Sequence, residues 1–253
     1  MAKTDRLLND LLIAFHLLTR LPLPPANWGN SERPSASAAW AYPLVGVVLG
    51  GLAAVVAWLA LWAGLSAALA AGVFLGAMAL MSGAMHEDGL ADCADGFWGG
   101  WERDRRLDIM KDSQIGTYGV LALSIIVGLK WIVLTHILEN ASLWVLLTAP
   151  VLSRAAMVTV MAALPHAREG GLSHSTGKPD RVATYTAFAL GMLAAFSMGI
   201  GTGIVLLLIA GAATLALAAF AKAKIGGQTG DVLGAVQCVT EACLLLTLST
   251  VIA

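Results

Sequence analysis

Long apolar runs recur along almost the whole 253-residue sequence. Several contain 18 or more predominantly apolar residues, the length that an α-helix needs to cross the hydrocarbon layer of a bilayer. Only 12% of the residues are charged, whereas a soluble domain has about 25%. The sequence therefore predicts an all-α, polytopic membrane protein without a large soluble domain. The predicted spans, about seven in number, are 40–63, 66–85, 117–138, 142–163, 183–200, 203–221 and 232–253.

The N-terminal segment, residues 1–39, does not continue this pattern. Its apolar part, Leu7 to Leu18, has roughly 12 residues, fewer than a span requires. A proline-rich stretch ends it, and the charges within it argue against a cleavable signal peptide. We expect an interfacial or re-entrant helix here, within a single membrane-embedded domain that covers residues 1–253. Arg20 is compatible with an interfacial anchor or with a phosphate ligand.

The positive charges are distributed unevenly among the predicted loops. All Lys and Arg residues except Lys130 and Arg154 lie at 3–33, 103–111, 168–181 or 222–224. With seven spans and an N-terminal segment that does not cross, these four regions share one side of the membrane. The positive-inside rule assigns that side to the cytoplasm. We therefore expect a multi-pass protein of the cell inner membrane whose polar loops face the cytoplasm.

Three charged residues lie inside the predicted spans: Lys130, Arg154 and Glu241. Charges inside a bilayer are costly, so they are usually paired or functional. Arg154 either reaches an anionic substrate or pairs with Glu241, and pairing is the favoured interpretation. The sequence does not assign a role to Lys130.

The densest group of acidic residues lies in the segment 86–116, between two apolar runs. Five of these acids fall at helical spacing, so that each group shares one helix face: Asp88, Asp92 and Asp95, then Asp108 and Asp112. The Gly-rich stretch 96–100 between the two groups allows the chain to turn back. Two short acidic helices that face each other would form a cage of carboxylate oxygens. Such a cage suits Mg²⁺ or Mn²⁺ and, through the metal, a pyrophosphate.

Three functions are compatible with this acidic segment. A solvated acidic loop is the common explanation of a charge run, but it does not explain the helical spacing. A divalent-cation carrier would place its carboxylates in the middle of several spans. A metal-dependent transferase that acts on a diphosphate at the membrane surface would cluster them at one end, as observed. Small residues between the acids, such as Gly89 and Ala91, would let a metal–phosphate complex approach the backbone.

A second polar segment, residues 222–231, precedes the last apolar run and contains a Gly-rich loop. Backbone N–H groups at the start of a helix form an anion site, although the same kind of turn is often only a helix cap. Gln228 and Thr229 add donors, and Asp231 either caps the helix or binds metal. The expected phosphate- or cofactor-binding residues are Gly226, Gly227, Gln228, Thr229 and Asp231. In the loop 164–182, Arg168, His174 and Lys178 are candidates for contacts with a nucleotide or with the side chains of a large cofactor-like substrate.

The pattern Asp92-x-x-Asp95-Gly96 followed by Asp108-x-x-x-Asp112 resembles the signature of the CDP-alcohol phosphotransferases. The resemblance is partial. The Ala-Arg pair expected in the first half is absent, and the two halves are closer together than in that family. The resemblance implies two metals held by four carboxylates, which neutralise a diphosphate while a hydroxyl attacks.

Four motifs that together cover nearly the whole chain resemble the cobalamin (5′-phosphate) synthase family, CobS. They are Leu18-Thr19-Arg20-Leu21-Pro22-x-Pro24, His86-x-Asp88-Gly-Leu-Ala-Asp92-x-x-Asp95-Gly96, Ile109-Met110-Lys111-Asp112-Ser113-x-x-Gly116-Thr117-x-Gly119 and Gly226-Gly227-Gln228-Thr229-Gly230-Asp231-x-x-Gly234-Ala235. Two positions depart from the family pattern. Asp108 replaces a more usual Glu, and Glu87 occupies a position that need not be acidic.

This resemblance implies the late joining step of cobalamin biosynthesis. Adenosylcobinamide-GDP and α-ribazole, or its 5′-phosphate, would give adenosylcobalamin, or its 5′-phosphate, and GMP. The implied cofactor is Mg²⁺, and the candidate ligands are Asp88, Asp92, Asp95, Asp108 and Asp112. By analogy Asp112 takes the proton of the incoming hydroxyl. Lys111 and Arg105 or Arg106 are candidates for holding the departing phosphate, and the two arginines are also compatible with cytoplasmic anchoring. His86 is a candidate for orienting a ligand or binding phosphate, or is simply a histidine at a helix end. The implied partners are these small molecules and the lipid bilayer. No basic tract suggests nucleic acid, and a homo-oligomer is compatible with the sequence.

Overall fold

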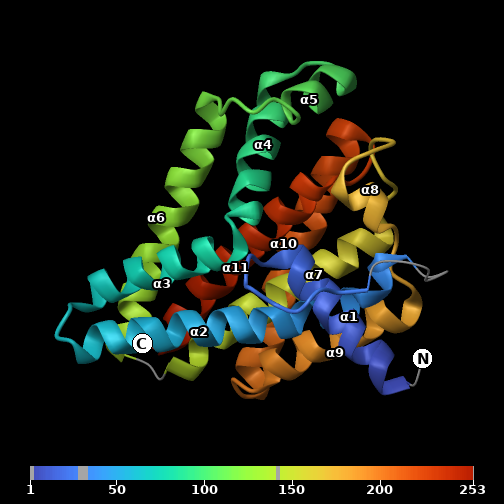
Figure 1. The fold of residues 1–253 in the computed structure, drawn as a ribbon. Helices are drawn as coiled ribbons and strands as arrows, with labels where there is room; N and C mark the ends of the chain where they lie inside the picture. Colours follow the sequence, from blue (N-terminus) through green and yellow to red (C-terminus); the bar gives the residue numbers. More distant parts are fainter. Residues whose placement is uncertain (1–2, 28–33, 141–142, 253) are drawn as a thin grey trace.

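The structure is a computed structural model that describes residues 3–27, 34–140 and 143–252. Among these residues every regular element is a helix, which confirms the predicted all-α class. The elements, shown in Figure 1, are α1 (Lys3–Leu18), η1 (Ser35–Ala41), α2 (Tyr42–Trp62), α3 (Ala67–Ser82), α4 (Met85–Gly99), α5 (Arg103–Ile109), α6 (Thr117–Asn140), η2 (Leu143–Leu147), α7 (Thr148–Ala163), α8 (Leu172–Thr176), α9 (Arg181–Phe196), α10 (Ile200–Ile225) and α11 (Gly230–Ile252).

Within the described residues, five helical segments are long and apolar enough to cross a membrane. They are Ser35–Trp62, Thr117–Asn140, Leu143–Ala163, Ile200–Ile225 and Gly230–Val251. The two other predicted spans, at 66–85 and 183–200, hold α3 and α9, which have only 16 residues each. α3 reaches a sufficient length only together with α4, and this pair is bent by 88°. The polytopic class is confirmed, with five spans, or six if the bent pair crosses, instead of about seven.

The bend between α3 and α4 arises from two consecutive residues in the left-handed conformation. Gly83 (φ 68°) ends α3, and Ala84 (φ 52°) precedes α4. The N-terminal segment braces this bend, because the Arg20 N–H donates to the Met81 carbonyl at 2.7 Å. The Arg20 side chain lies against Gly83, where a Cβ would come within 2.8 Å of the arginine Nε. The apolar helix therefore stops at the bend, and the acidic stretch continues as a separate helix.

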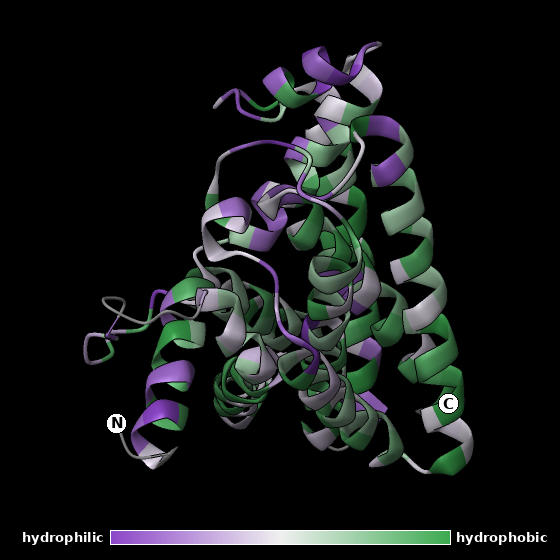
Figure 2. Cartoon of the chain, turned by 90° about the vertical axis from the view of Figure 1, so that its right-hand side faces the viewer, coloured by the Kyte–Doolittle hydropathy of each residue, from purple (hydrophilic) through white to green (hydrophobic). Residues whose placement is uncertain are grey.

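α11 occupies the centre of the fold, packed against α4, α6, α7 and α10 (Figure 1). α1 lies on the outside against η1 and is not among the five long apolar helices, so its interfacial position stays a prediction. Figure 2 shows hydrophilic residues concentrated at one end of the molecule and along the N-terminal helix, with the long helices mainly hydrophobic. The arrangement brings the start of α11 beside the acidic helix α4.

Candidate active site

The predicted acidic helix is α4, which begins directly after the bend. Its three aspartates lie on one helical face and differ in exposure. Asp88, in the first turn, is exposed, Asp92 is half-buried, and Asp95 is 8% exposed. The face therefore leads from solvent into the protein, and each aspartate meets a different environment.

Asp95 accepts two backbone hydrogen bonds at the start of α6. The Gly116 N–H donates to its Oδ2 at 2.7 Å, and the Gly119 N–H donates to its Oδ1 at 2.9 Å. A Cβ at either glycine would lie 2.5 Å from this carboxylate, so only glycine allows the approach. A negative charge here is also stabilised by the N-terminal end of the helix dipole. Asp95 thus fixes α6 to α4, and each of its oxygens keeps a lone pair for the predicted metal.

α4 and α11 touch through their backbones. A Cβ at Gly89 would lie 2.7 Å from the Asp231 carbonyl oxygen, and a Cβ at Gly234 would lie 3.1 Å from the His86 Cα. These two glycines belong to different sequence motifs, one in each helix. Their contact brings Asp231 to the acidic face of α4.

Asp92 lies where these carboxylates meet, on α4 and outside the five long apolar helices. Burial, followed by the negative charges of Asp231, Asp88 and Asp95, raises the pKa of Asp92 to about 7, while Arg168 acts in the opposite direction. Crowded carboxylates resist simultaneous ionisation, and a divalent cation between them would relieve this repulsion. The carboxylate oxygens of Asp88, Asp92 and Asp231 are of the chemical kind that Mg²⁺ prefers, although the three side chains do not converge closely enough in this structure to hold an ion together.

Arg168, in the loop after α7, reaches the same cluster. Its Nη2 lies 3.4 Å from Asp231 Oδ2, whereas its Nη1 is buried without a hydrogen-bond partner. The two side chains line a cavity of about 130 Å³ between α1, α2, α4, α7, α8 and α11. The polar side chains of this site cavity are His86, Asp88, Arg168, Ser173, Thr176 and Asp231, and its apolar wall includes Leu17, Leu18, Tyr42, Met157, Met161 and Leu172.

The Gly-rich loop packs on the segment that follows α7. Gly226 ends α10 in the left-handed conformation (φ 83°), and a Cβ at Gly227 would lie 2.2 Å from the Pro165 carbonyl oxygen. The Gln228 N–H donates to that carbonyl at 2.8 Å, and the Ala167 N–H donates to the Gln228 carbonyl at 2.9 Å. The backbone of the loop is thus paired with residues 165–167.

The side chains of this loop continue the connection. Gln228 is buried; its Oε1 accepts from Ser173 Oγ at 2.6 Å, and its Nε2 lies 3.0 Å from His166 Nδ1. Thr229 Oγ1 accepts the backbone N–H three residues later at 3.3 Å and donates to Asp231 Oδ2 at 3.0 Å. Thr229 therefore caps α11, and Asp231 turns toward Arg168. Phosphate binding by this loop stays a prediction, because several of its donors already have protein partners.

The second acidic group is exposed and does not line the site cavity. Asp108 in α5, together with Lys111 and Asp112 in the turn that follows, is exposed. Asp112 Oδ1 accepts the Gln114 N–H at 3.1 Å. In the part of the chain that the structure describes, no three His, Cys, Asp or Glu side chains converge closely enough to hold a metal ion. The five-carboxylate cage is therefore not assembled in this structure, and its binding of Mg²⁺ stays a prediction.

Two arginines of α5, Arg103 and Arg106, contact backbone carbonyls, whereas Arg105 is exposed. Arg106 donates to the Lys224 carbonyl and to the Gly100 carbonyl, each at 2.9 Å. Arg103 donates to the Ile225 carbonyl at 3.0 Å and also to the Ala167 carbonyl. Cations are favourable at the C-terminal end of a helix such as α10. These two arginines thus hold α5 over the end of α10.

Comparison with known proteins places this architecture in a family. Residues 10–249 match the model of the CobS family, described as cobalamin-5-phosphate synthase. This chain belongs to the cobalamin-5-phosphate synthase family. A protein of Mesorhizobium japonicum is 38% identical over 96% of this chain and 94% of its own length, and one of Bradyrhizobium diazoefficiens is 42% identical over 94% and 92%. Both are named adenosylcobinamide-GDP ribazoletransferase. No solved structure matches this chain significantly.

Membership in the synthase family makes this protein an enzyme of the transferase class. Two of the motifs that carried the resemblance meet in the fold, because the chain packs the His86 motif of α4 on the Asp231 motif of α11. Sequence reasoning did not predict that Asp231 would stand beside Asp92. The two glycines, Gly89 and Gly234, were the available signal, since paired glycines allow two helices to approach closely. Arg168 was considered only as one of several loop residues.

Proposed function

We propose that this enzyme joins adenosylcobinamide-GDP to α-ribazole, or to its 5′-phosphate, and releases GMP. The products are adenosylcobalamin, or its 5′-phosphate, in a late step of cobalamin biosynthesis. The observation that carries the proposal is the site cavity, where a carboxylate face and a partly unsatisfied arginine meet an apolar wall. The family membership favours this reaction over a CDP-alcohol phosphotransferase or a cation carrier.

The two halves of the cavity suit the two kinds of group that the reaction brings together. Arg168 has a buried Nη1 to spare, and a guanidinium binds phosphate oxygens with charge-assisted hydrogen bonds. The apolar wall, with Tyr42, Met157 and Met161, suits the aromatic base of the ribazole. Asp88 and Asp231 lie at the polar end, where the ribose hydroxyl would meet the diphosphate.

Asp88, Asp92 and Asp231 are the carboxylates that would hold Mg²⁺ beside the diphosphate, with Asp95, Asp108 and Asp112 as further ligands predicted from sequence. When bound, Mg²⁺ neutralises the diphosphate and lowers the pKa of a nearby hydroxyl. The hydroxyl oxygen attacks the phosphorus attached to cobinamide, the bond to the GMP oxygen breaks, and a carboxylate accepts the hydroxyl proton. By the family analogy Asp112 accepts this proton and Lys111 binds the departing phosphate, although both are exposed outside the site cavity in this structure. Arg168 lines the cavity and is the phosphate ligand that the geometry supports, and His86 positions the acidic helix.

The site faces the cytoplasm in this proposal, in the cell inner membrane. The hydrophilic end of the molecule in Figure 2 and the positions of the Lys and Arg residues support this orientation. Adenosylcobinamide-GDP and GMP carry charged phosphates that do not cross a bilayer. A nucleotide-bearing substrate that is made in the cytoplasm must therefore be used on the cytoplasmic side of the membrane.

The test uses the purified full-length protein in lipid nanodiscs with adenosylcobinamide-GDP, α-ribazole and Mg²⁺. We expect GMP release in step with corrin product, and loss of both on chelation of the metal. Asp92→Asn should abolish turnover. Asp104→Asn, which alters an exposed carboxylate paired with Arg103 at 2.9 Å, is the matched control and should retain it.

Two results would contradict the proposal. One is the absence of product with α-ribazole and with its 5′-phosphate. The other is efficient turnover of CDP-diacylglycerol with simple alcohols, which would instead assign the chain to phospholipid synthesis.

A further inference from the structure

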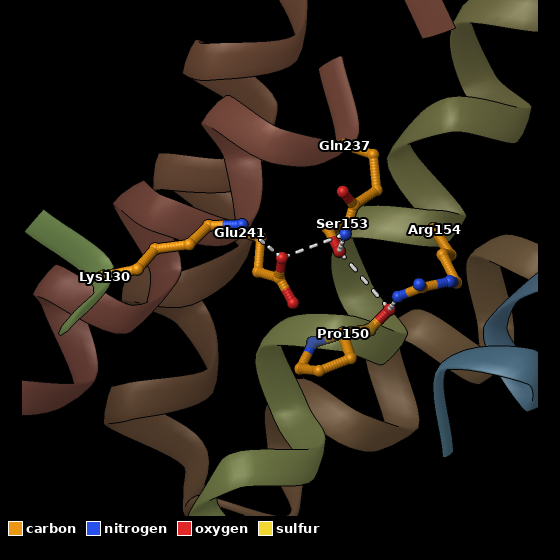
Figure 3. Close-up of polar contacts among 6 residues, drawn as sticks. All are labelled: Lys130, Pro150, Ser153, Arg154, Gln237 and Glu241. Carbon is orange, nitrogen blue, oxygen red and sulfur yellow. Dashed lines mark hydrogen bonds and ion pairs between the residues drawn. The ribbon is translucent and has the colours of Figure 1, made fainter. Parts of the chain in front are cut away.

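A buried polar network links three helices behind the site cavity (Figure 3). Lys130 Nζ of α6 lies 2.6 Å from Glu241 Oε2 of α11, and both side chains are at most 7% exposed. Gln237 Nε2 donates to the same Glu241 oxygen at 3.1 Å and to Ser153 Oγ of α7 at 3.2 Å. Pairing of Arg154 with Glu241 was the favoured expectation, but Lys130 is the residue that forms the ion pair.

Arg154 extends this network toward α4. It is 1% exposed, and its Nη1 donates to the Pro150 carbonyl of its own helix at 3.0 Å. Its Nε is buried without a hydrogen-bond partner. Figure 3 shows its guanidinium directed along α7, on the side of Ser153 opposite to Lys130. The guanidinium is held at one end, and its buried Nε–H is left without a partner.

Two polar atoms at the start of α4 also lack hydrogen-bond partners. His86 Nε2 and Glu87 Oε2 are both buried without hydrogen-bond partners, and His86 is 2% exposed as a whole. His86, Glu87 and Arg154 line one small cavity together with Lys130, Gln237 and Glu241. Three unsatisfied atoms from two helices thus border one internal space.

The size and chemistry of this space suit a single water molecule. Its volume is about 20 Å³, and a site for one water needs at least roughly 10–15 Å³ and two to four polar partners. A water oxygen accepts from Arg154 Nε–H, one water O–H donates to Glu87 Oε2, and His86 Nε2 takes the remaining donor or acceptor position. All three unsatisfied atoms are then paired, as buried polar groups normally are.

We propose that this inner cavity binds one structural water that bridges His86, Glu87 and Arg154. Because His86 also lines the site cavity, the bridge makes Glu87 and Arg154 positioning residues for the active site. The Lys130–Glu241 pair holds α6 against α11, and the water joins α7 to α4. Because His86 is in the first turn of α4, fixing its side chain also fixes the position of the acidic face. Glu87, which the family resemblance does not require to be acidic, thereby acquires a role.

The first test is a thermal double-mutant cycle on the nanodisc protein. Glu87→Gln and Arg154→Gln each remove one charge from the bridge and leave the opposite charge buried without a counter-charge, so each should lower the Tm by roughly 10 °C. The double variant removes both charges, so its Tm should fall by clearly less than the sum of the two single losses. Strict additivity would overturn the bridge. Thr159→Val, an exposed hydroxyl of the same helix α7, is the matched control and should leave the Tm unchanged.

The second test is an experimental structure at a resolution that shows ordered water. Density for one water within hydrogen-bond distance of His86 Nε2, Glu87 Oε2 and Arg154 Nε is expected. Direct pairing of Glu87 with Arg154, with no density between them, would overturn the proposal. This measurement and the thermal cycle require no substrate.

The third test separates a positioning role from a merely structural one, and it rests on the proposed function. For Glu87→Gln we expect kcat per folded molecule to fall about tenfold, which corresponds to about 1.4 kcal/mol, while KM changes less than twofold. An unchanged kcat would refute the positioning role. If the unaltered protein formed no cobalamin product, the proposed function would fail, while the cycle and the density would still decide the water site.

Discussion

Asp92 and Asp95 are only three residues apart, yet the structure predicts opposite effects on stability when each is changed to asparagine. Asp95 accepts two backbone N–H groups at the start of α6, at 2.7 and 2.9 Å. Asn can accept only one of them and presents an N–H₂ to the other. Since a hydrogen bond to a buried charge contributes roughly 1.5–3 kcal/mol, Asp95→Asn should cost about 3 kcal/mol. For a chain of this length that is a fall in Tm of about 6–12 °C.

The ionised side chain of Asp92, in contrast, lowers the stability of the folded protein. Burial, and then the charges of its neighbours, raises its pKa from the ordinary value to about 7, so the folded state holds this proton more tightly than the unfolded chain. Stability attributable to Asp92 therefore falls as the pH rises from about 4 to 7, and the penalty is complete above about pH 7. Because Asp92 is only half-buried, solvent screening limits the penalty to about 1–2 kcal/mol. At pH 8 without divalent cation, Asp92→Asn should raise the Tm by about 2–8 °C.

The assay is thermal unfolding of both variants and the unaltered protein in nanodiscs, at pH 5 and pH 8, with EDTA or with Mg²⁺. The gain of Asp92→Asn should shrink at pH 5, and Mg²⁺ should raise the Tm of the unaltered protein more than that of this variant. A fall in Tm for Asp92→Asn at pH 8, or an unchanged Tm for Asp95→Asn, would refute the assignment of a strained carboxylate and a capping carboxylate.

Three further predictions follow from close contacts and from the cavity. Gly116→Ala, just before α6, would place a methyl group 2.5 Å from the capping carboxylate and should lower the Tm by several degrees, whereas Gly128→Ala within α6, where nothing lies within 4 Å, should not lower it. Gly227→Ala would place a methyl group 2.2 Å from a backbone carbonyl of the loop after α7 and should likewise destabilise the protein, measured by the same unfolding assay. Arg168→Gln should raise KM for adenosylcobinamide-GDP about tenfold or more, while Arg181→Gln, an exposed arginine at the start of α9, should not; equal KM values in a steady-state assay would remove Arg168 from the phosphate site.

The all-α membrane class was predictable because it depends on apolar run lengths, which a sequence displays directly. The number of spans was less predictable. A span requires one continuous helix of sufficient length, and an apolar run in the sequence does not show whether the helix continues through it. The apolar run 66–85 predicts one span, but Gly83 and Ala84 adopt positive φ and end α3 after 16 residues. Composition at this point changes little before His86, so the pattern of apolar residues did not mark the bend.

In the site, sequence spacing correctly placed Asp88, Asp92 and Asp95 on one helix face. Spacing also suggested that α5 would face this helix and complete a cage, because the Gly-rich turn allows it. In the structure Asp108 and Asp112 are exposed, while α11 supplies Asp231. The spacing of residues along the sequence describes only one helix at a time. Which helices pack together depends on whether their backbones can approach closely. Here that approach depends on single glycines that are far apart in the chain, such as Gly89 and Gly234.

The distribution of glycines explains why the acidic helix can be both crowded with charge and firmly placed. Gly89 rests on the Asp231 backbone, Gly234 rests on His86, and Gly116 lets the start of α6 receive Asp95. None of these contacts uses the side chain of Asp88 or Asp92, so the two carboxylates with the least protein support are free for a ligand. The stabilising interactions lie at one end of the acidic face and the electrostatic strain at the other. Binding of a cation at the strained end would therefore relieve the repulsion between these carboxylates, while the glycine contacts hold the backbone of α4 in place.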